Sequence, residues 1–256
     1  MLSVLKQLLE KIPADKVRAI AVDGTSSTLL LTDQKGKPLG PALMYDDSRS
    51  REEADFLKRC LHKECTSDPV PPQQTACLSA SSSLAKLLYL YNRNKHARHA
   101  LHQADWVSGQ LSGHFGISDE NNCLKLGYDP VNRCWPDWLD KTGIPTDLFP
   151  EAKEPGNEIG AICESVRKKL GLPSDTMVMA GTTDSTAAFI ATGANNIGEA
   201  VSSLGSTLVI KVLSDKPVFA PEYGVYSHRL GNQWLIGGAS NTGGAVLLKY
   251  FSLKQL

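Results

Sequence analysis

Apolar and polar residues follow one another along this chain in patterns that predict both strands and helices. Residues 1–16 (MLSVLKQLLEKIPADK) place Lys and Glu among leucines, which is typical of an amphipathic helix. Residues 17–23 (VRAIAVD) and 28–33 (TLLLTD) are apolar runs joined by a Gly/Thr/Ser turn, and another turn follows at Gly36. We interpret the two runs as successive strands of a meander.

Helices are predicted in the stretch that follows. The apolar spacing from about Ser48 to Leu61, together with its Arg and Glu residues, favours one helix. Ser82 or Ser83 can cap a second helix, and a third follows it; their sequences are LAKLLYLYNRN and HQADWVSGQLSG. Residues 115–160 are rich in Gly, Pro, Asn and Trp, so we expect them to be mostly irregular, with a short helix near PDWLDKTG.

Strand and helix patterns become sharper after residue 160. A helix is predicted over about 162–170, and the short apolar run TMVMAG is typical of a buried strand. TTDSTAAFIATGA begins with capping residues and continues as a helix. Paired strands and the opening of a helix follow: EAVSSLGSTLVIKVLS with its turn at Gly205, YGVYSHRL with QWLIGGA, and NTGGAVLLKYF. This mixture of strands and helices places the chain in the α/β class.

Composition and charge narrow the kind of protein. Of the 256 residues, 41% are hydrophobic and 21% are charged, which is a globular mixture and excludes a disordered chain. Lys+Arg and Asp+Glu both number 27, whereas a nucleic-acid-binding protein normally carries a basic excess. No apolar run approaches the roughly 18 residues of a membrane span, and the N-terminus does not resemble a signal peptide. We therefore expect a soluble, cytoplasmic protein that binds neither nucleic acid nor membrane.

Neither the cysteines nor the histidines predict a metal site. The six cysteines, at positions 60, 65, 77, 123, 134 and 163, contain no CxxC pair, and free thiols are the expected state. His96, His99 and His102 recur every three residues in a polar stretch. Because a step of three drifts around a helix, we interpret them as part of a solvated face.

The strongest candidate for chemistry is Asp184, within AGTTDSTAA. It lies where a buried strand leads into a helix, so it should project from the carboxyl edge of the sheet, where ligands bind in open α/β proteins. The helix N-terminus would keep its carboxylate ionised and able to accept a proton. The alternative is that Asp184 serves only as an N-cap, which is a common role of Asp at that position.

Two Gly-containing turns could bind phosphate. Gly205, Ser206 and Thr207 form a predicted hairpin tip whose backbone N–H groups and hydroxyls are suitable donors, although an ordinary tight turn has the same sequence. The DGTSS run at residues 23–27 lacks the GxxxxGK[ST] pattern and a following Lys, so it is not a P-loop.

A third candidate site lies between a strand and a helix at residues 44–49 (MYDDSR). Two carboxylates and Arg49 in this segment suit hydrogen bonding to a polyol, with a solvated helix cap as the alternative. The Gly-rich segment at 237–244 lacks the GxSxG spacing of a nucleophile elbow.

The order of these motifs resembles that of the FGGY carbohydrate kinases. AIAVDGTSSTLLLTDQKGKPLGPALMYDDSR is similar to the family stretch that ends in Trp-x-Asp-x-Arg, with Tyr45 in place of the Trp. SSSLAKLLYL resembles the family's Lys-Leu-Leu-Trp helix through Lys86, AGTTDSTAAF the segment of the catalytic Asp, and LGSTLVIK the second phosphate motif. Within the family, the motif set looks most like the D-ribulose kinases, also labelled xylulose kinase-like, of cyanobacteria and plant plastids.

The resemblance implies a ribonuclease H-like (actin-like ATPase) fold and ATP-dependent phosphorylation of a ketopentose at its terminal hydroxyl, with D-ribulose as first candidate. Asp184 would be the general base. ATP and Mg²⁺ would be the cofactors, with the triphosphate held by the amides of Gly205, Ser206 and Thr207. The residues facing the sugar would be Thr25, Ser26, Ser27, Asp47 and Arg49.

The chain also departs from the family pattern. The family's first phosphate motif, Asp-x-Gly-Thr-Ser, precedes the point where this chain starts, because the run at 23–27 matches a later strand beside the sugar. The adenosine-binding Gly-rich segment would follow residue 256. We therefore expect a chain truncated at both ends, with residues 1–212 forming the sugar-binding domain without its first strands and 213–256 beginning the nucleotide domain.

Other functions stay open at this stage. The chain could be a non-catalytic sugar-binding fragment or an inactive remnant of such a kinase. A fragment of an actin-like ATPase or chaperone is a further alternative, but it would not require the Asp47/Arg49 pair. The sequence does not separate D-ribulose from D-xylulose or L-ribulose, since a few hydroxyl contacts decide that preference.

Overall fold

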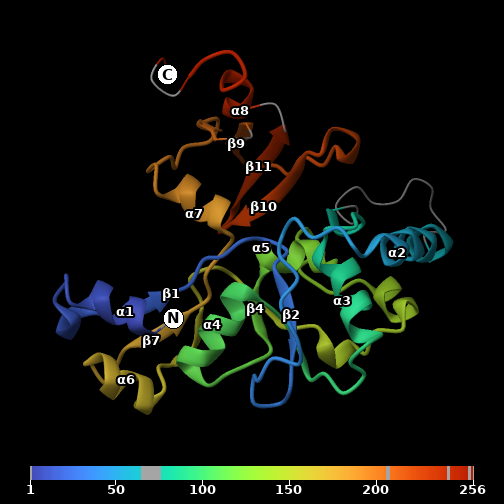
Figure 1. Ribbon diagram of the computed structural model, residues 1–256. Coiled ribbons are helices and arrows are strands. Elements are labelled where there is room, and N and C mark those ends of the chain that lie inside the picture. The colour runs from blue at the N-terminus through green and yellow to red at the C-terminus, as the bar shows by residue number, and fades with distance from the viewer. Residues whose placement is uncertain (1, 65–75, 206–207, 241–242, 253–254, 256) are drawn as a thin grey trace.

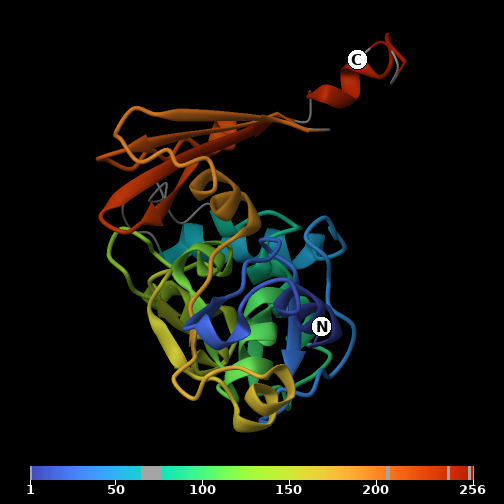
Figure 2. The same ribbon diagram turned by 90° about the vertical axis from the view of Figure 1, so that its left-hand side faces the viewer.

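The computed structural model describes residues 2–64, 76–205, 208–240, 243–252 and 255. Figures 1 and 2 show a larger body formed by the first two thirds of the chain, with a four-stranded sheet and α7 stacked on one end of it. The helices are α1 (Leu2–Leu9), α2 (Arg51–Glu64), α3 (Ser83–Tyr91), α4 (Gln103–Ser112), α5 (Glu120–Cys123), α6 (Glu164–Leu170), α7 (Asp184–Ile190) and α8 (Gly244–Leu247). Short 3₁₀ helices occupy Ala14–Lys16, Leu124–Leu126, Asp137–Thr142, Thr146–Leu148 and Pro221–Tyr223.

The strands form small sheets. They are β1 (Ala19–Ala21), β2 (Leu29–Thr32), β3 (His99–His102), β4 (Ile117–Asp119), β5 (Glu151–Lys153), β6 (Glu158–Ala161), β7 (Met177–Met179), β8 (Ala200–Leu204), β9 (Leu208–Ser214), β10 (Tyr226–Leu230) and β11 (Gln233–Ser240). In the first sheet, of order β1-β7-β6, β1 and β7 are parallel, with Ala19 opposite Met177 and Ala21 opposite Met179. The carboxyl ends of β1 and β7 therefore meet at one edge.

The predicted meander of the first two apolar runs is wrong. β1 pairs with β7, whereas β2 pairs with β3 in an antiparallel sheet, with Leu29 opposite His102. Leu29, Leu30 and Leu31 are buried on both faces of β2, so this strand needs a covered position inside the body. The turn at Gly36 is confirmed: its N–H donates to the Asp33 carbonyl (3.0 Å), and its φ of 73° favours glycine.

The solvated face predicted for the three histidines is also wrong, because His102 is buried. His102 belongs to β3, and its ring lies between two polar partners. Nε2 shares a hydrogen bond with Ser83 Oγ (2.9 Å), and Nδ1 contacts Asp105 Oδ2 (3.0 Å). These partners satisfy the imidazole inside the protein, which no local polarity pattern reveals. His96 is exposed, as expected.

Most of the predicted helices and the later strands are confirmed. Ser82 is the N-cap residue of α3, and α4 and α6 fall within their predicted ranges. The segment 115–160 is less irregular than expected, since it contains β4, α5, β5 and most of β6. Asp119 supplies the local order there by accepting hydrogen bonds from the backbone N–H groups of Asn121 and Asn122 (both 3.0 Å).

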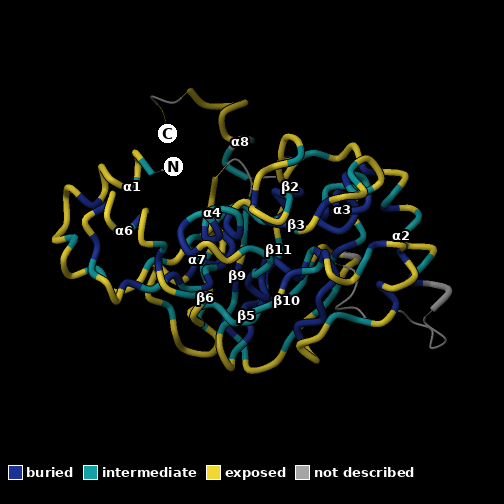
Figure 3. The backbone as a smooth tube through the Cα atoms, turned by 90° about the horizontal axis from the view of Figure 1, so that it is seen from below, coloured by how far each residue is buried: buried dark blue, intermediate teal, exposed yellow. Residues whose placement is uncertain are grey.

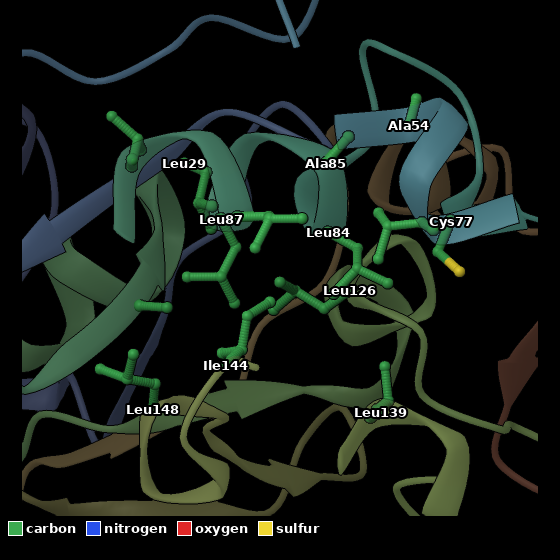
Figure 4. Close-up of a cluster of buried hydrophobic side chains, with 14 of the residues drawn as sticks. Leu29, Ala54, Cys77, Leu84, Ala85, Leu87, Leu126, Leu139, Ile144 and Leu148 are labelled. Atoms are coloured by element: carbon green, nitrogen blue, oxygen red, sulfur yellow. The ribbon is translucent and has the colours of Figure 1, made fainter. Parts of the chain in front are cut away.

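The main core lies between β2, α2 and α3. Figure 4 shows leucines of α3, including Leu84 and Leu87, pointing toward Leu126 and Ile144, and these side chains are at most 3% exposed. A second cluster joins α1, α4, α6 and β7 through buried residues such as Leu111 and Val178. In Figure 3 the tube is dark blue along α3 and mostly yellow along α1, which lies at the periphery.

The four-stranded antiparallel sheet has the order β10-β11-β9-β8. The predicted hairpins are confirmed: β8 pairs with β9 and β10 with β11. One face of the sheet packs on α7, where Phe189 contacts Leu213 and Leu235 in a small buried cluster. The ribbon of Figure 2 shows α7 between this sheet and the larger body.

The pairing of β1 with β7 requires a glycine at position 181. A Cβ at Gly181 would overlap the backbone carbonyl oxygen of Val22, which cannot move without moving the strand. Gly181→Ala should therefore lower the free energy of unfolding by about 3 kcal/mol or more, as overpacking with a backbone shift does. Urea unfolding followed by circular dichroism measures this loss.

Gly40→Ala is the matched control for this substitution. A Cβ at Gly40 meets nothing within 4 Å, and its backbone does not have a positive φ. We expect a change of less than about 0.5 kcal/mol. Equal effects of the two substitutions would contradict the close approach of Gly181 to Val22.

Candidate functional site

The candidate site is built at the edge where β1 and β7 end. Beyond the ends of β1 and β7, the two segments stay paired through a parallel bridge between Gly24 and Thr183. The backbone N–H of Asp184 donates to the Gly24 carbonyl (2.9 Å). Asp184 thus follows the carboxyl end of a strand, as its sequence context predicts, and lies directly beside the turn at 23–27.

The side chain of Asp184 is available to a ligand. The residue is exposed, and Oδ1 accepts a hydrogen bond from the Ser185 backbone N–H (2.6 Å). Among the described residues, no hydrogen bond to its second carboxylate oxygen is present. A carboxylate held in this way can accept a proton from a bound hydroxyl group.

The turn at 25–27 brings hydroxyl groups together beside Asp184. Thr25 Oγ1 and Thr28 Oγ1 share a hydrogen bond (2.6 Å), and Ser27 has a φ of 66°, which is uncommon for a non-glycine residue. The Oγ atoms of Ser26 and Ser27 are buried and lack a hydrogen-bond partner within the described part of the chain. Buried hydroxyls normally have a partner, so these two are suited to a polar ligand.

Asp47 and Arg49 form a two-point ion pair. Arg49 Nε lies 2.9 Å from Asp47 Oδ1, and the Nη2 of Arg49 lies 2.8 Å from Oδ2. The hydrogen bond from Arg49 lowers the pKa of the Asp47 carboxyl. The Arg49 side chain is 56% exposed and that of Asp47 16%, so the pair keeps hydrogen-bonding capacity toward solvent or a polyol.

Lys86 joins the 25–27 turn to the segment that carries Asp47. It is the largest fully buried side chain among the described residues, and its Nζ donates to three backbone carbonyls: Ser27 (2.8 Å), Met44 (2.6 Å) and Tyr45 (3.3 Å). Burial lowers the pKa of Lys86 to about 8. The α3 motif of the sequence contains Lys86 without indicating a role for it, although a lone Lys among buried leucines is itself a signal of an internal partner.

The phosphate-binding candidates are described in part. Gly205 follows β8 and is exposed, and its carbonyl accepts a hydrogen bond from the Gly244 N–H (2.7 Å). Ser206 and Thr207 lie outside the described residues. A cavity of about 230 Å³ lies between α7 and the two strands of this hairpin, β8 and β9. Its lining includes Ser185, Ser203 and Lys211. Strands β8 and β9 therefore face α7, the helix that begins at Asp184, across this cavity.

Asn121 connects the larger body to the four-stranded sheet. Its Nδ2 donates to Thr182 Oγ1 and to the Arg229 carbonyl, both at 3.0 Å. The Arg229 side chain returns to the body, with Nε donating to the Pro130 carbonyl (2.9 Å). These contacts fix β10 next to the strand end that carries Asp184, and no sequence motif pointed to them.

A divalent metal ion at this site would need ligands from a nucleotide. Among the described residues, no group of three or more His, Cys, Asp or Glu side chains could hold a metal ion. Exposed carboxylates of Asp23 and Asp184 lie at the strand edge, and Mg²⁺ commonly takes one or two carboxylates together with substrate phosphates. The residues therefore fit a Mg²⁺ ion carried by a triphosphate.

None of the helices in the described part of the chain is both long and apolar enough to cross a bilayer.

Solved structures share this fold. A xyloylose kinase from Brucella ovis matches with a TM-score of 0.83 and 23% identity, covering 97% of this chain and 51% of the other. Plasmodium falciparum glycerol kinase with ADP matches with a TM-score of 0.77 and 16% identity, covering 100% of this chain and 55% of the other. The fold is therefore the ribonuclease H-like, actin-like ATPase fold of the sugar kinases, as the sequence motifs predict.

Sequence comparison assigns the family. The model of the N-terminal domain of the FGGY family of carbohydrate kinases matches residues 1–191, so the chain belongs to this family. Autoinducer-2 kinases from Yersinia pestis (strain Pestoides F) and Yersinia pseudotuberculosis serotype O:1b are each 26% identical over 224 residues, which is 83% of this chain and 41% of theirs. The chain thus spans less than half the length of these relatives and about half that of the solved structures.

The role of Lys86 can be tested by removing its charge. Lys86→Met keeps an apolar stem but leaves the carbonyls of Ser27, Met44 and Tyr45 without this donor. We expect a loss of about 2–4 kcal/mol in the free energy of unfolding, measured by urea titration. Lys35→Met, at an exposed hairpin position, is the control and should be neutral. If Lys86→Met is as stable as the parent chain, the hydrogen bonds of Lys86 do not hold the 25–27 turn to the segment that carries Asp47.

A pH-dependent loss of stability is predicted from Glu120. This side chain is 2% exposed, its Oε1 has no hydrogen-bond partner among the described residues, and Oε2 lies 3.4 Å from Arg133 Nε. Burial raises the pKa of Glu120 from 4.5 to about 7. Between these values the folded state holds a proton that the unfolded state has released, so stability is highest below the lower value and falls as pH rises toward 7.

Glu120→Gln removes this titration. Relative to the variant, the parent chain should lose on the order of 2 kcal/mol of unfolding free energy between pH 5 and pH 8. Urea unfolding at four pH values across this range measures the difference. Stability curves that run parallel for the two proteins would show that Glu120 ionises normally.

Proposed function

We propose that this chain is the sugar-binding part of an ATP-dependent kinase that phosphorylates the terminal hydroxyl of a ketopentose, and that the substrate is D-ribulose. The observation that carries the proposal is the position of the exposed Asp184, whose backbone N–H donates to the carbonyl of Gly24, directly before the hydroxyl-bearing turn at 25–27. A proton acceptor and a set of polyol-binding groups at one strand edge are what phosphorylation of a sugar requires.

Asp184 would act as general base. The sugar hydroxyl gives its proton to the carboxylate while its oxygen forms a bond to the γ-phosphorus, and the bond from that phosphorus to the bridging oxygen breaks to release ADP. Because Asp184 is fixed through its backbone to Gly24, the acceptor keeps its place relative to the sugar turn. Such positioning supplies much of the rate in phosphoryl transfer.

The remaining site residues would hold the two substrates. Hydroxyls at 25–27 and the Asp47/Arg49 pair suit the alternating donors and acceptors of a polyol. Backbone N–H groups of the hairpin at Gly205, Ser206 and Thr207 would contact the phosphates of ATP. When bound, Mg²⁺ would neutralise part of the negative charge on the triphosphate.

Support for the sugar comes from two sources. The relatives and solved structures named above include autoinducer-2 kinases, a xyloylose kinase and a glycerol kinase, and each of these comparisons covers at least 83% of this chain. Among the family's substrates, D-ribulose is favoured by the motif set from HQADWVSGQLSG to GGASNTGG. We place the reaction in the cytoplasm, where ATP is available.

The division of the chain into residues 1–212 and 213–256 remains part of this proposal. The four-stranded sheet extends on both sides of residue 212, which lies in β9. The alternative function is a non-catalytic sugar-binding fragment or an inactive remnant of such a kinase.

Kinase activity is tested by ADP formation with MgATP and D-ribulose, D-xylulose or L-ribulose. The assay uses two polypeptides. One is the 256-residue chain, and the other is a longer polypeptide that contains this chain and has the full length of its relatives. We expect D-ribulose to give the highest kcat/KM, and Asp184→Asn to lower kcat by about 10²–10⁴-fold through loss of the general base. Asp215→Asn, at an exposed loop position, is the control.

Three outcomes separate the alternatives. Saturable D-ribulose binding to both polypeptides without ADP formation would favour the non-catalytic fragment. ADP formation that persists within twofold in the Asp184→Asn variant would contradict the assigned base, and absence of turnover with any ketopentose or related polyol would contradict the kinase.

A further inference from the structure

A small cavity with several polar groups in a mainly apolar lining lies between α7 and the inner face of the four-stranded sheet. Its volume is about 150 Å³, and its polar lining comes from Ser185, Lys211, Tyr226 and His228. Ser185 directly follows Asp184, so the cavity adjoins the proposed general base. The sequence did not single out Lys211, Tyr226 or His228 as site residues, although Lys211 ends the LGSTLVIK run that resembles the second phosphate motif.

Lys211 presents a buried ammonium group to this cavity. The residue is 6% exposed, and Nζ donates to Ser185 Oγ (3.1 Å) and Thr186 Oγ1 (3.3 Å). An ammonium has three N–H donors, so these hydroxyls leave one for a further acceptor. Both contacts are to neutral oxygens, and no carboxylate among the described residues forms an ion pair with Lys211.

His228 supplies a second incomplete group. It is 5% exposed, and within the described part of the chain its Nδ1 has no hydrogen-bond partner. Burial first, and then the charges of Lys211 and Lys125, hold the pKa of His228 well below its usual value. A buried ring nitrogen without a partner is rare in folded proteins and indicates a place for a ligand.

A third basic group faces the same region. Lys125 is half-buried on the larger body, and its Nζ lies 5.6 Å from the centre of the Tyr226 ring. Burial lowers the pKa of Lys211 to about 8; the charge of Asp184 opposes this shift, and the charge of Lys125 adds to it. The charged groups near the cavity are therefore Lys211, Lys125 and Asp184. Among the described residues, no ion pair with Lys125 occurs. An anion would relieve the repulsion between the lysines, whereas a neutral sugar would not.

We propose that this cavity is a phosphate-binding site, in which Lys211, His228 and Lys125 hold the phosphate group that lies beside Asp184. The inference rests on the proposed kinase function, because that reaction brings a phosphate to Asp184. The group belongs either to the phosphoryl donor or to the phosphorylated sugar. Lysine is a common phosphate ligand that acts as a compact charge, and a phosphate oxygen would complete its third hydrogen bond.

The probe is inorganic phosphate titrated into the 256-residue chain by isothermal calorimetry at low ionic strength. We expect saturable binding at one site, and a loss of affinity of about tenfold or more in Lys211→Met, because a charge-assisted hydrogen bond is removed. Lys125→Met should lower the affinity by a smaller factor. Lys216→Met, which removes an exposed lysine beyond the end of β9, is the control and should leave binding within twofold.

Folding of each variant is checked by circular dichroism, and Lys125→Met provides an independent readout because its residue is only half-buried. Absence of saturable phosphate binding to the parent chain would overturn the proposal. Equal phosphate affinity of Lys211→Met, Lys125→Met and Lys216→Met would also overturn the proposal, since the phosphate would then bind outside this cavity.

Competition identifies the source of the phosphate. Displacement of inorganic phosphate by MgATP assigns the cavity to the donor, displacement by D-ribulose 5-phosphate assigns it to the product, and displacement by neither contradicts the proposal. None of these readouts requires turnover. A chain without kinase activity can thus still confirm the phosphate site, and an active kinase can still fail this test.

Discussion

The parallel pairing of β1 with β7 is the interaction on which the rest of the site depends. It joins segments far apart in the sequence, and it continues past the strands through the Gly24–Thr183 bridge and the hydrogen bond from Asp184 to Gly24. Because the segment after β7 lies so close to the backbone of Val22, position 181 has no space for a side chain. A single backbone arrangement therefore places Asp184, at the start of α7, next to the 25–27 turn.

Buried polar groups then fix the other segments around this edge. Lys86 holds a carbonyl of the 25–27 turn and one of the segment that leads to Asp47, and Asn121 holds the four-stranded sheet against Thr182. In both cases one side chain satisfies several backbone or hydroxyl groups that would otherwise be buried without partners. The candidate site is thus a junction of elements that are positioned by hydrogen bonds to backbone atoms. Candidate side chains such as Asp184 and Arg49 can therefore stay exposed, because the backbone holds them in place.

Local pattern predicted the parts of this arrangement that depend on local physics. The apolar run TMVMAG and the capping residues after it gave the correct position of Asp184, and the small residues at 204–208 gave the correct hairpin. Strand pairing failed for the first two runs, because the partners of β1 and β2 lie far along the chain and alternation does not identify them. The solvated face predicted for His102 was wrong for a related reason, because its ring is buried by a partner on another element. Lys211 was not a candidate site residue, because its hydroxyl partners lie on α7. Family resemblance supplied the roles of the site residues, which remain proposals.

Hydrogen–deuterium exchange of the chain with and without saturating D-ribulose tests most directly whether this strand edge binds the sugar. If the strand edge binds the sugar, exchange should slow in the peptides that cover residues 23–29, 44–49 and 182–187, with little change in α1 or α6. These segments are separate in sequence and meet only at the junction formed by β1, β7 and Lys86. Unchanged exchange in all of them, or protection confined to other parts of the chain, would contradict the claim that this edge is the sugar site.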